Sequence, residues 1–163
     1  MVLSVDFCDR CLHAGIFDID LVEKKATVWN SGDSRLSMTN LGTVAQAIVS
    51  ILSSSFIEMQ TRDRFITIES FAASQNDILT AIENNSGKKW SLEKTTTEVQ
   101  YETAQNEWNN GEYEKAYIRW LMGSVYVERE GWPFPAESIE NELLGLPKET
   151  LEQSLGVILK TQT

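Results

Sequence analysis

Residues 64–95 read RFITIESFAASQNDILTAIENNSGKKWSLEKT, and their pattern changes twice. The first six residues, 64–69, alternate and are rich in β-branched side chains, which predicts a strand. A helix is predicted over 74–87, because it opens with a serine and, three residues later, an aspartate, a pair that resembles a capping box, and it closes at a glycine. Residues 90–95 alternate again. The stretch therefore predicts a strand, a helix and a strand in succession, as in an α/β protein.

The segment that precedes this stretch predicts one more strand and a long helix. Residues 24–29 are followed by the turn-forming residues Asn-Ser-Gly-Asp at 30–33, so a strand is expected to end there. From Thr39 or Asn40, either of which is a suitable N-cap, apolar residues recur at helical spacing. The predicted helix has one apolar stripe, which is expected to be buried and consists of Leu41, Val44, Ala45, Ile48, Val49 and Leu52.

The C-terminal half is predicted to be mainly helical. Helices are expected over 99–109, 113–129 and 138–143, and a last helix is expected to begin at Pro147. One helical stripe that is predicted to belong to the core consists of Tyr113, Tyr117 and Trp120. No repeat and no Gly/Ser-rich linker interrupts the sequence. It therefore predicts a single α/β domain over 1–163, with few strands and a predominantly helical C-terminal half.

The chain has 163 residues, with 24 acidic and 14 basic side chains, so its formal net charge is −10. Binding to nucleic acid depends on clustered Lys and Arg that neutralise phosphates, so we expect no nucleic-acid partner. The longest apolar-rich run, 44–52, is far shorter than the ~18 residues of a membrane span, so we expect no membrane partner. The first residues lack the basic and apolar regions of a secretion signal, and we expect a cytoplasmic protein.

Cys8, Cys11 and His13 form a motif that suggests redox or metal chemistry. A Cys-x-x-Cys pair can be a redox dithiol or half of a zinc site. A closed zinc site needs four ligands, and the sequence holds two cysteines and one histidine in all. The helix that a thioredoxin-like dithiol requires is interrupted by Gly15. The motif therefore predicts reduced thiols that behave as small apolar residues, and no metal site is expected.

Motifs that bind nucleotide phosphates are missing from the sequence. Gly32 stands alone, and the run Ser86-Gly87-Lys88-Lys89 lacks both the upstream glycine and the Ser or Thr of a P-loop. No cofactor is therefore expected in this chain. If the protein is an enzyme, the acid–base candidates are His13, Asp9 and Tyr126, chosen on residue type alone.

Aromatic residues gather in the C-terminal half, where they could line a pocket. Trp132 and Phe134 stand in a loop with Pro133 and Pro135 that fixes their backbone, so they are predicted to belong to a pocket or a lid.

The order of these elements resembles that of the NmrA-like, isoflavone-reductase-like family of atypical short-chain dehydrogenases/reductases. The segments that carry the resemblance are 26–33 (ATVWNSGD), 36–41 (LSMTNL), 65–71 (FITIESF), 74–79 (SQNDIL), 87–90 (GKKW) and 145–147 (GLP). The similarity extends over about residues 7–159. It covers the C-terminal, substrate-side part of the family.

The resemblance implies a reductase-related fold whose other half is a Rossmann domain that binds NADPH. The glycine-rich turn and the catalytic lysine of the family would lie upstream of Met1, so no catalytic or phosphate-binding residue is carried over. The segment 7–16 resembles a stretch beside the family's substrate pocket, and the loop 132–134 resembles the one that closes it. The residues expected to bind substrate are Phe7, Phe71, Tyr126, Trp132 and Phe134.

Three functions are compatible with these observations. The first is a reductase homologue without a dinucleotide site that binds an apolar small molecule, as an accessory protein or as an enzyme with a repurposed pocket. The second is an interaction module, either a homodimer or a subunit that docks on a partner protein, with the exposed edge of its sheet covered. The third is a C-terminal fragment of an NADPH-dependent oxidoreductase.

Overall fold

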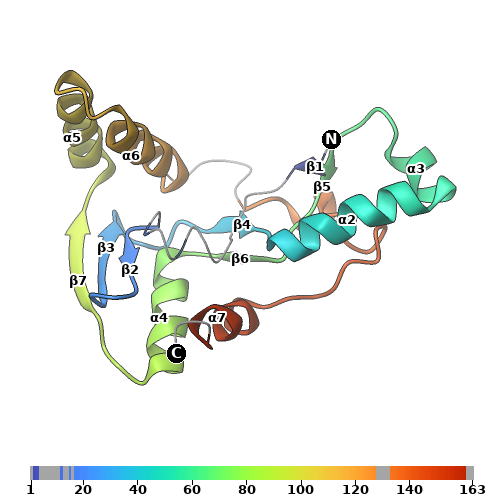
Figure 1. Ribbon diagram of the computed structural model, residues 1–163, viewed down its shortest axis with the longest axis horizontal. Helices are drawn as coiled ribbons and strands as arrows, with labels where there is room; N and C mark the ends of the chain where they lie inside the picture. The colour runs from blue at the N-terminus through green and yellow to red at the C-terminus, as the bar shows by residue number, and fades with distance from the viewer. Residues whose placement is uncertain (1, 4–11, 13–14, 16, 128–132, 161–163) are drawn as a thin grey trace. The chain divides into compact units, whose positions relative to one another are not determined.

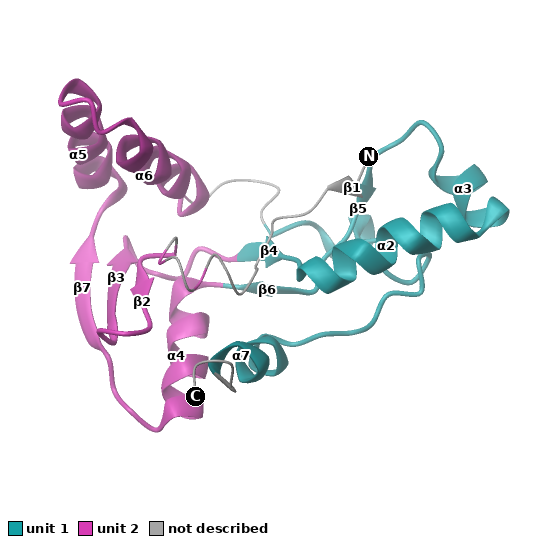
Figure 2. Cartoon of the chain, viewed as in Figure 1, with its two compact units in different colours: residues 1–8, 36–73, 131–163 teal, residues 9–35, 74–130 magenta. Residues whose placement is uncertain are grey.

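The computed structural model describes all residues except 1, 4–11, 13–14, 16, 128–132 and 161–163 (Figure 1). They form two compact units, each built from separate parts of the chain (Figure 2). Unit 1 comprises residues 1–8, 36–73 and 131–163, and unit 2 comprises residues 9–35 and 74–130. Both units contain helices and short strands, so the predicted α/β fold class is confirmed. The single domain over 1–163 stays a prediction.

Unit 2 contains a three-stranded sheet in the order β2–β3–β7. The strands are β2 (Ile19–Asp20), β3 (Lys25–Trp29) and β7 (Ser91–Thr95). β2 and β3 are antiparallel, whereas β3 and β7 are parallel, with Lys25 opposite Ser91 and Trp29 opposite Thr95. The two strands predicted over 24–29 and 90–95 are confirmed. Their parallel pairing places their carboxyl ends at the same edge of the sheet.

Helix α4 (Gln75–Ser86) follows the predicted signals at both ends. The backbone amide of Asp77 donates to Ser74 Oγ, and the Asp77 carboxylate accepts from the Ser74 amide, so the capping box is formed. At the other end, Gly87 adopts the left-handed conformation with φ 64°, and its amide donates to the Glu83 carbonyl. A glycine is suited to this position because it has no Cβ to clash.

Helices α5 (Thr97–Asn109) and α6 (Tyr113–Val125) form a hairpin in unit 2. The guanidinium of Arg119 binds the Glu107 carboxylate with Nε–O distances of 3.0 and 2.9 Å. The predicted core stripe on α6 is wrong in part, because Tyr113 and Tyr117 are 57% and 62% exposed. The hairpin is instead packed through smaller buried residues, among them Ala104 and Ala116.

Unit 1 has two pairs of short strands and most of the remaining helices (Figure 2). The strand pairs are β1 (Val2–Leu3) with β5 (Ile66–Thr67), parallel, and β4 (Leu36–Met38) with β6 (Phe71–Ala73), antiparallel. The helices are α2 (Leu41–Ser53), α3 (Ser55–Thr61), the 3₁₀ turn η1 (Ala136–Ser138) and α7 (Leu151–Lys160). Its core cluster consists of Ala47, Ile66, Ile68, Leu144 and Leu146.

The apolar stripe predicted on α2 is wrong as a buried stripe for most of its members. The helix buries Thr43 and Ala47, and Val44 packs against the core, whereas Leu41, Ile48, Val49 and Leu52 are exposed. Helical periodicity shows which residues share a face, but it cannot show whether the chain itself supplies the surface that covers this face.

Several predicted boundaries are also corrected by the structure. The strand predicted over 64–69 is reduced to the two residues of β5, which pairs with β1 and not with β7. Residues 138–143 form no α-helix, since η1 and turns stand there. The last helix begins at Leu151 and not at Pro147, and α6 ends at Val125.

In the part of the chain that the structure describes, no single helix has the length and apolar character of a membrane span. Helices α2 and α3 meet these criteria only when taken together, and they are bent by 107° relative to each other.

Candidate functional site

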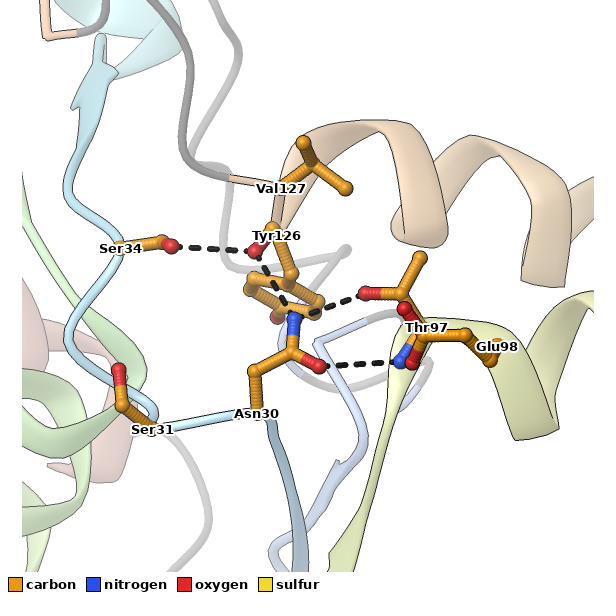
Figure 3. Close-up of a pocket in the computed structure, with 7 residues that line it drawn as sticks. All are labelled: Asn30, Ser31, Ser34, Thr97, Glu98, Tyr126 and Val127. Carbon is orange, nitrogen blue, oxygen red and sulfur yellow. Dashed lines mark hydrogen bonds between the residues drawn. The ribbon is translucent and has the colours of Figure 1, made fainter.

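A pocket of about 370 Å³ lies in unit 2 at the carboxyl ends of the parallel strands β3 and β7 (Figure 3). Its lining comes from the end of β3, the start of α5 and the end of α6, and consists of Asn30, Ser31, Ser34, Thr97, Glu98, Tyr126 and Val127. In open sheets with parallel strands, ligands bind outside the carboxyl ends of the strands. The location alone therefore makes this pocket the candidate binding site of the described residues.

Asn30 joins the three segments that line the pocket (Figure 3). Its Nδ2 donates to Thr97 Oγ1 at 2.7 Å and to the Tyr126 carbonyl at 3.4 Å, and its Oδ1 accepts from the Thr97 amide at 3.0 Å. Its φ is 54°, a left-handed conformation that asparagine tolerates better than most residues. Ser34 Oγ also donates to the Tyr126 carbonyl, at 3.0 Å. The pocket is therefore held together by side-chain amide and hydroxyl groups.

The N-terminus of α5 is already capped where it reaches the pocket. The Val99 amide donates to the N-cap Thr96 Oγ1 at 3.4 Å, and the Thr97 amide is used by Asn30. A hydrogen bond from its own backbone amide, and a second from Thr96, hold the pKa of Glu98 below its ordinary value. A carboxylate thus stands at the helix end that would otherwise attract an anion.

Tyr126 forms the buried wall of the pocket. The residue is 3% exposed, its Oη donates to the Phe17 carbonyl at 3.2 Å, and its ring centroid lies 5.5 Å from that of Trp29. Burial, and then the negative charge of Asp18, raise the pKa of Tyr126 well above its ordinary value. The hydroxyl is therefore a neutral donor that is engaged with the backbone. A catalytic role for Tyr126 stays a prediction.

A buried polar network supports this wall, and sequence reasoning missed all of it. The indole Nε1 of Trp29 donates to the Asp18 carboxylate. Gln75 Oε1 accepts from the Trp29 amide at 2.9 Å, and Gln75 Nε2 donates to the carbonyls of Phe17 and Thr27 at 3.2 and 3.1 Å. The network fixes β3 against the start of α4 and holds the loop that contains Phe17.

Asp18 is the titratable member of this network. Burial raises its pKa, whereas the hydrogen bond from Trp29 and the positive charge of Arg119 lower it, and the net shift is upward. A carboxyl group with a raised pKa in the folded state favours folding below its unfolded pKa. This contribution is lost as the pH rises through the folded pKa. Above the folded pKa, the ionised carboxylate of Asp18 therefore lowers the stability of the folded state.

We expect Asp18→Asn to be at least as stable as the wild type at pH 7. Asparagine keeps an oxygen acceptor for the Trp29 indole and tolerates the φ of 54° at this position, and it removes the buried charge. The stability advantage is expected to shrink as the pH falls toward 3.8, the ordinary pKa of the carboxyl group. Urea unfolding of both proteins at several pH values measures this difference.

Asp63→Asn is the matched control, because Asp63 also has a positive φ of 59° and is exposed. It removes one negative charge and leaves the buried network intact. A loss of stability at pH 7 in Asp18→Asn that is absent from Asp63→Asn would contradict the prediction.

The structure brings only part of the predicted site residues to this pocket. Tyr126 lines it, whereas Phe71 in β6 and Phe134 belong to unit 1 and are not among its lining residues. In unit 1, the Phe134 amide donates to Ser37 Oγ at 2.7 Å, and Phe71 stands opposite Met38. The remaining predicted residues, Phe7, Asp9, His13 and Trp132, lie outside the described residues, as do Cys8 and Cys11.

The lining residues that the sequence analysis did not select are mostly polar. Asn30 was part of a predicted turn, and its position directly after a strand of a parallel pair is the signal that could have identified it. Thr97 and Glu98 follow the second strand of that pair in the same way. The pairing itself was needed to bring these two strand ends together.

No family model matches the chain. The chain is 33% identical to the oxidoreductase aprR of Aspergillus flavus over 85 aligned residues. These residues are 52% of this chain and 28% of aprR. It is 23% identical to the oxidoreductase poxI of Penicillium oxalicum over 96 aligned residues, which are 59% of this chain and 30% of poxI. Each match extends over less than a third of the curated relative.

Among solved structures, a nucleoside-diphosphate-sugar epimerase from Staphylococcus aureus is similar with a TM-score of 0.54. The similarity covers 94% of this chain and 50% of the epimerase, at 13% sequence identity. The chain therefore shares its mixed α/β fold with part of that epimerase and is related in sequence to proteins named oxidoreductases.

Proposed function

We propose that this chain is the substrate-side part of an NmrA-like, reductase-related protein, and that it binds a neutral small organic molecule in the pocket beside Asn30. The single observation that carries the proposal is the position of this pocket. It stands at the carboxyl ends of two adjacent parallel strands and is closed by the start of a helix. Its volume of about 370 Å³ is within the range of small-molecule sites.

The chemistry of the lining favours a neutral ligand that donates hydrogen bonds. The carboxylate of Glu98 is an acceptor, the hydroxyl groups of Ser31 and Thr97 can accept or donate, and Val127 and Tyr126 supply apolar surface. A hydroxylated aromatic molecule matches this combination of acceptors and apolar surface. It is more polar at one end than the apolar ligand that the sequence predicts.

The same lining disfavours a nucleotide phosphate. The amides of Thr97 and Val99 have partners within the chain, and Glu98 adds a negative charge at the helix end. A phosphate placed at this helix end would be repelled by Glu98, and these two amides are already engaged. We therefore propose that no dinucleotide binds in this pocket.

An oxidoreductase activity is the second candidate function. The sequence match to two proteins named oxidoreductases favours it. We take a nicotinamide-dependent hydride transfer as its form, as the family resemblance implies, and this form predicts that NADPH binds to the protein.

Thermal unfolding with two probes separates these candidates. A neutral hydroxylated isoflavone is expected to raise the melting temperature, because a ligand at 100 times its dissociation constant adds about 2.7 kcal/mol of stability. NADPH is expected to leave it unchanged. In Val127→Trp, the larger side chain fills the pocket, and the shift caused by the isoflavone is expected to disappear.

Val22→Trp is the matched control for this experiment. Val22 is also in unit 2, is exposed and is not among the lining residues, so this variant is expected to keep the shift. A shift with NADPH would favour the oxidoreductase activity. An isoflavone shift that survives in Val127→Trp, or no shift in the wild type, would contradict the proposed site.

A further inference from the structure

Helices α2 and α3, labelled in Figure 1, and Phe65, which precedes β5, have exposed apolar side chains. This set is here termed the α2–α3 face. Its seven large side chains, which are between 46% and 79% exposed, are Leu41, Ile48, Val49, Leu52, Phe56, Met59 and Phe65. The other side of α2 packs on the core of unit 1 through Ala47, Val44 and Ile51. The helix therefore has apolar residues on both sides, and Leu41, Ile48, Val49 and Leu52 remain exposed.

The exposed residues of α2 have the spacing of a helix–helix seam. Leu41, Ala45, Ile48 and Leu52 are separated by four, three and four residues. This 4-3-4 spacing places them in one line along the helix, as at the a and d positions of a coiled coil. A line of this kind packs best against another helix that presents a similar line.

The charge distribution indicates what kind of partner this face accepts. The chain has a formal net charge of −10, yet residues 36–57 contain no Asp, Glu, Lys or Arg. Two copies of a strongly acidic chain repel each other through most of their surface, and an uncharged face is where they can approach. Helix α2 therefore offers no carboxylate to a basic partner. The charged residues near the face lie on and after α3, where Glu58 is paired with Arg62, and Arg64 with Glu140. Helices that bind lipid surfaces carry Lys and Arg beside the apolar face, and α2 carries none.

We propose that the α2–α3 face binds a second copy of this chain, with α2 packed antiparallel against α2 of the copy. A two-fold axis near the middle of the helix sets Leu41 opposite Leu52 of the copy and Ala45 opposite Ile48 of the copy. The same axis repeats each of these contacts with the roles of the two copies exchanged. The small Ala45 opposite the larger Ile48 lets the helices interlock.

The size of the face is consistent with a stable dimer. Seven large apolar side chains that are half to three-quarters exposed present on the order of 700 Å² of surface. A standard interface buries about 800 Å² on each partner. A single exposed apolar patch on a monomer is usually about 300–600 Å².

The molar mass in solution tests the proposal. In sedimentation velocity, the mass of the wild type is expected to rise with protein concentration from 18.4 kDa to twice that value. Leu52→Glu places a carboxylate opposite Leu41 of the copy. The dissociation constant of the dimer is therefore expected to rise at least 100-fold, and the variant is expected to sediment as a monomer. Leu52 is 79% exposed, and an unchanged circular dichroism spectrum checks that the variant is folded.

Val157→Glu is the matched control, because Val157 is a 67% exposed residue of a helix in the same unit and lies outside the face. This variant is expected to dimerise as the wild type does. A wild type that stays at 18.4 kDa at every concentration would overturn the proposal and leave the face to a different partner. The proposal would also be overturned if Leu52→Glu and Val157→Glu had equal dissociation constants, or if Leu52→Glu dimerised as tightly as the wild type. These results do not depend on the pocket in unit 2.

Discussion

Gln75→Leu will lower the free energy of unfolding by about 2–4 kcal/mol. Leucine has nearly the same size as glutamine, but it cannot accept from the Trp29 amide or donate to the carbonyls of Phe17 and Thr27. The buried Trp29 amide then loses its acceptor, and a buried donor without a partner is costly. Urea unfolding followed by tryptophan fluorescence measures the change.

Gln105→Leu makes the same replacement at an exposed position of α5, where the Gln105 side chain donates to Asn109 Oδ1 at 3.3 Å on the surface of the same helix. Its expected effect is within about 0.5 kcal/mol. If the two variants unfold with equal free energies, the Gln75 network contributes nothing to stability, and the account of the pocket wall given above is wrong.

Trp29→Ala has the largest expected effect, a loss of about 3–5 kcal/mol. Trp29 is 2% exposed, its ring packs on Tyr126, and its indole is the donor to Asp18. The substitution leaves a cavity and removes the hydrogen bond to a half-buried carboxylate. We also expect the pocket to lose its ligand, because Tyr126 loses the ring that positions it. Binding of the isoflavone probe and urea unfolding measure the two effects.

Trp108→Ala is the control for the size of the deleted side chain. Trp108 is 44% exposed on the α5–α6 hairpin, where its ring contacts Tyr113 and Trp120. A smaller loss of stability is expected, with ligand binding unchanged. A greater loss than in Trp29→Ala would show that unit 2 is organised around the hairpin and not around β3.

Signals that act over a few residues were predicted correctly. The capping box of Ser74 and Asp77 and the glycine that ends α4 satisfy backbone groups within one turn of the helix, so they can be recognised in the sequence. The alternation in β3 and β7 is equally local, since successive side chains of a strand point to opposite faces. The helical character of residues 97–125 also follows from local periodicity.

The candidate site could be predicted only in part. Tyr126 was selected for its residue type, and the structure makes it one wall of the pocket. Asn30 bonds to Thr97, 67 residues away, and to Tyr126, 96 residues away, and no local pattern contains these partners. Gln75 belongs to the predicted start of a helix. Its hydrogen bond with Trp29, which lies 46 residues earlier, could not be predicted, because no local pattern contains both residues.

The acidic charge, the α/β class, the position of most helices and the strands β3 and β7 follow from the sequence, because they depend on composition and on neighbours a few residues apart. The parallel pairing of β3 with β7, the pocket that this pairing creates and the exposure of the α2 stripe appear only in the tertiary structure. The periodicity of apolar residues in the sequence shows which side chains share a face of a helix or strand. Burial of that face depends on which distant segment of the chain packs against it.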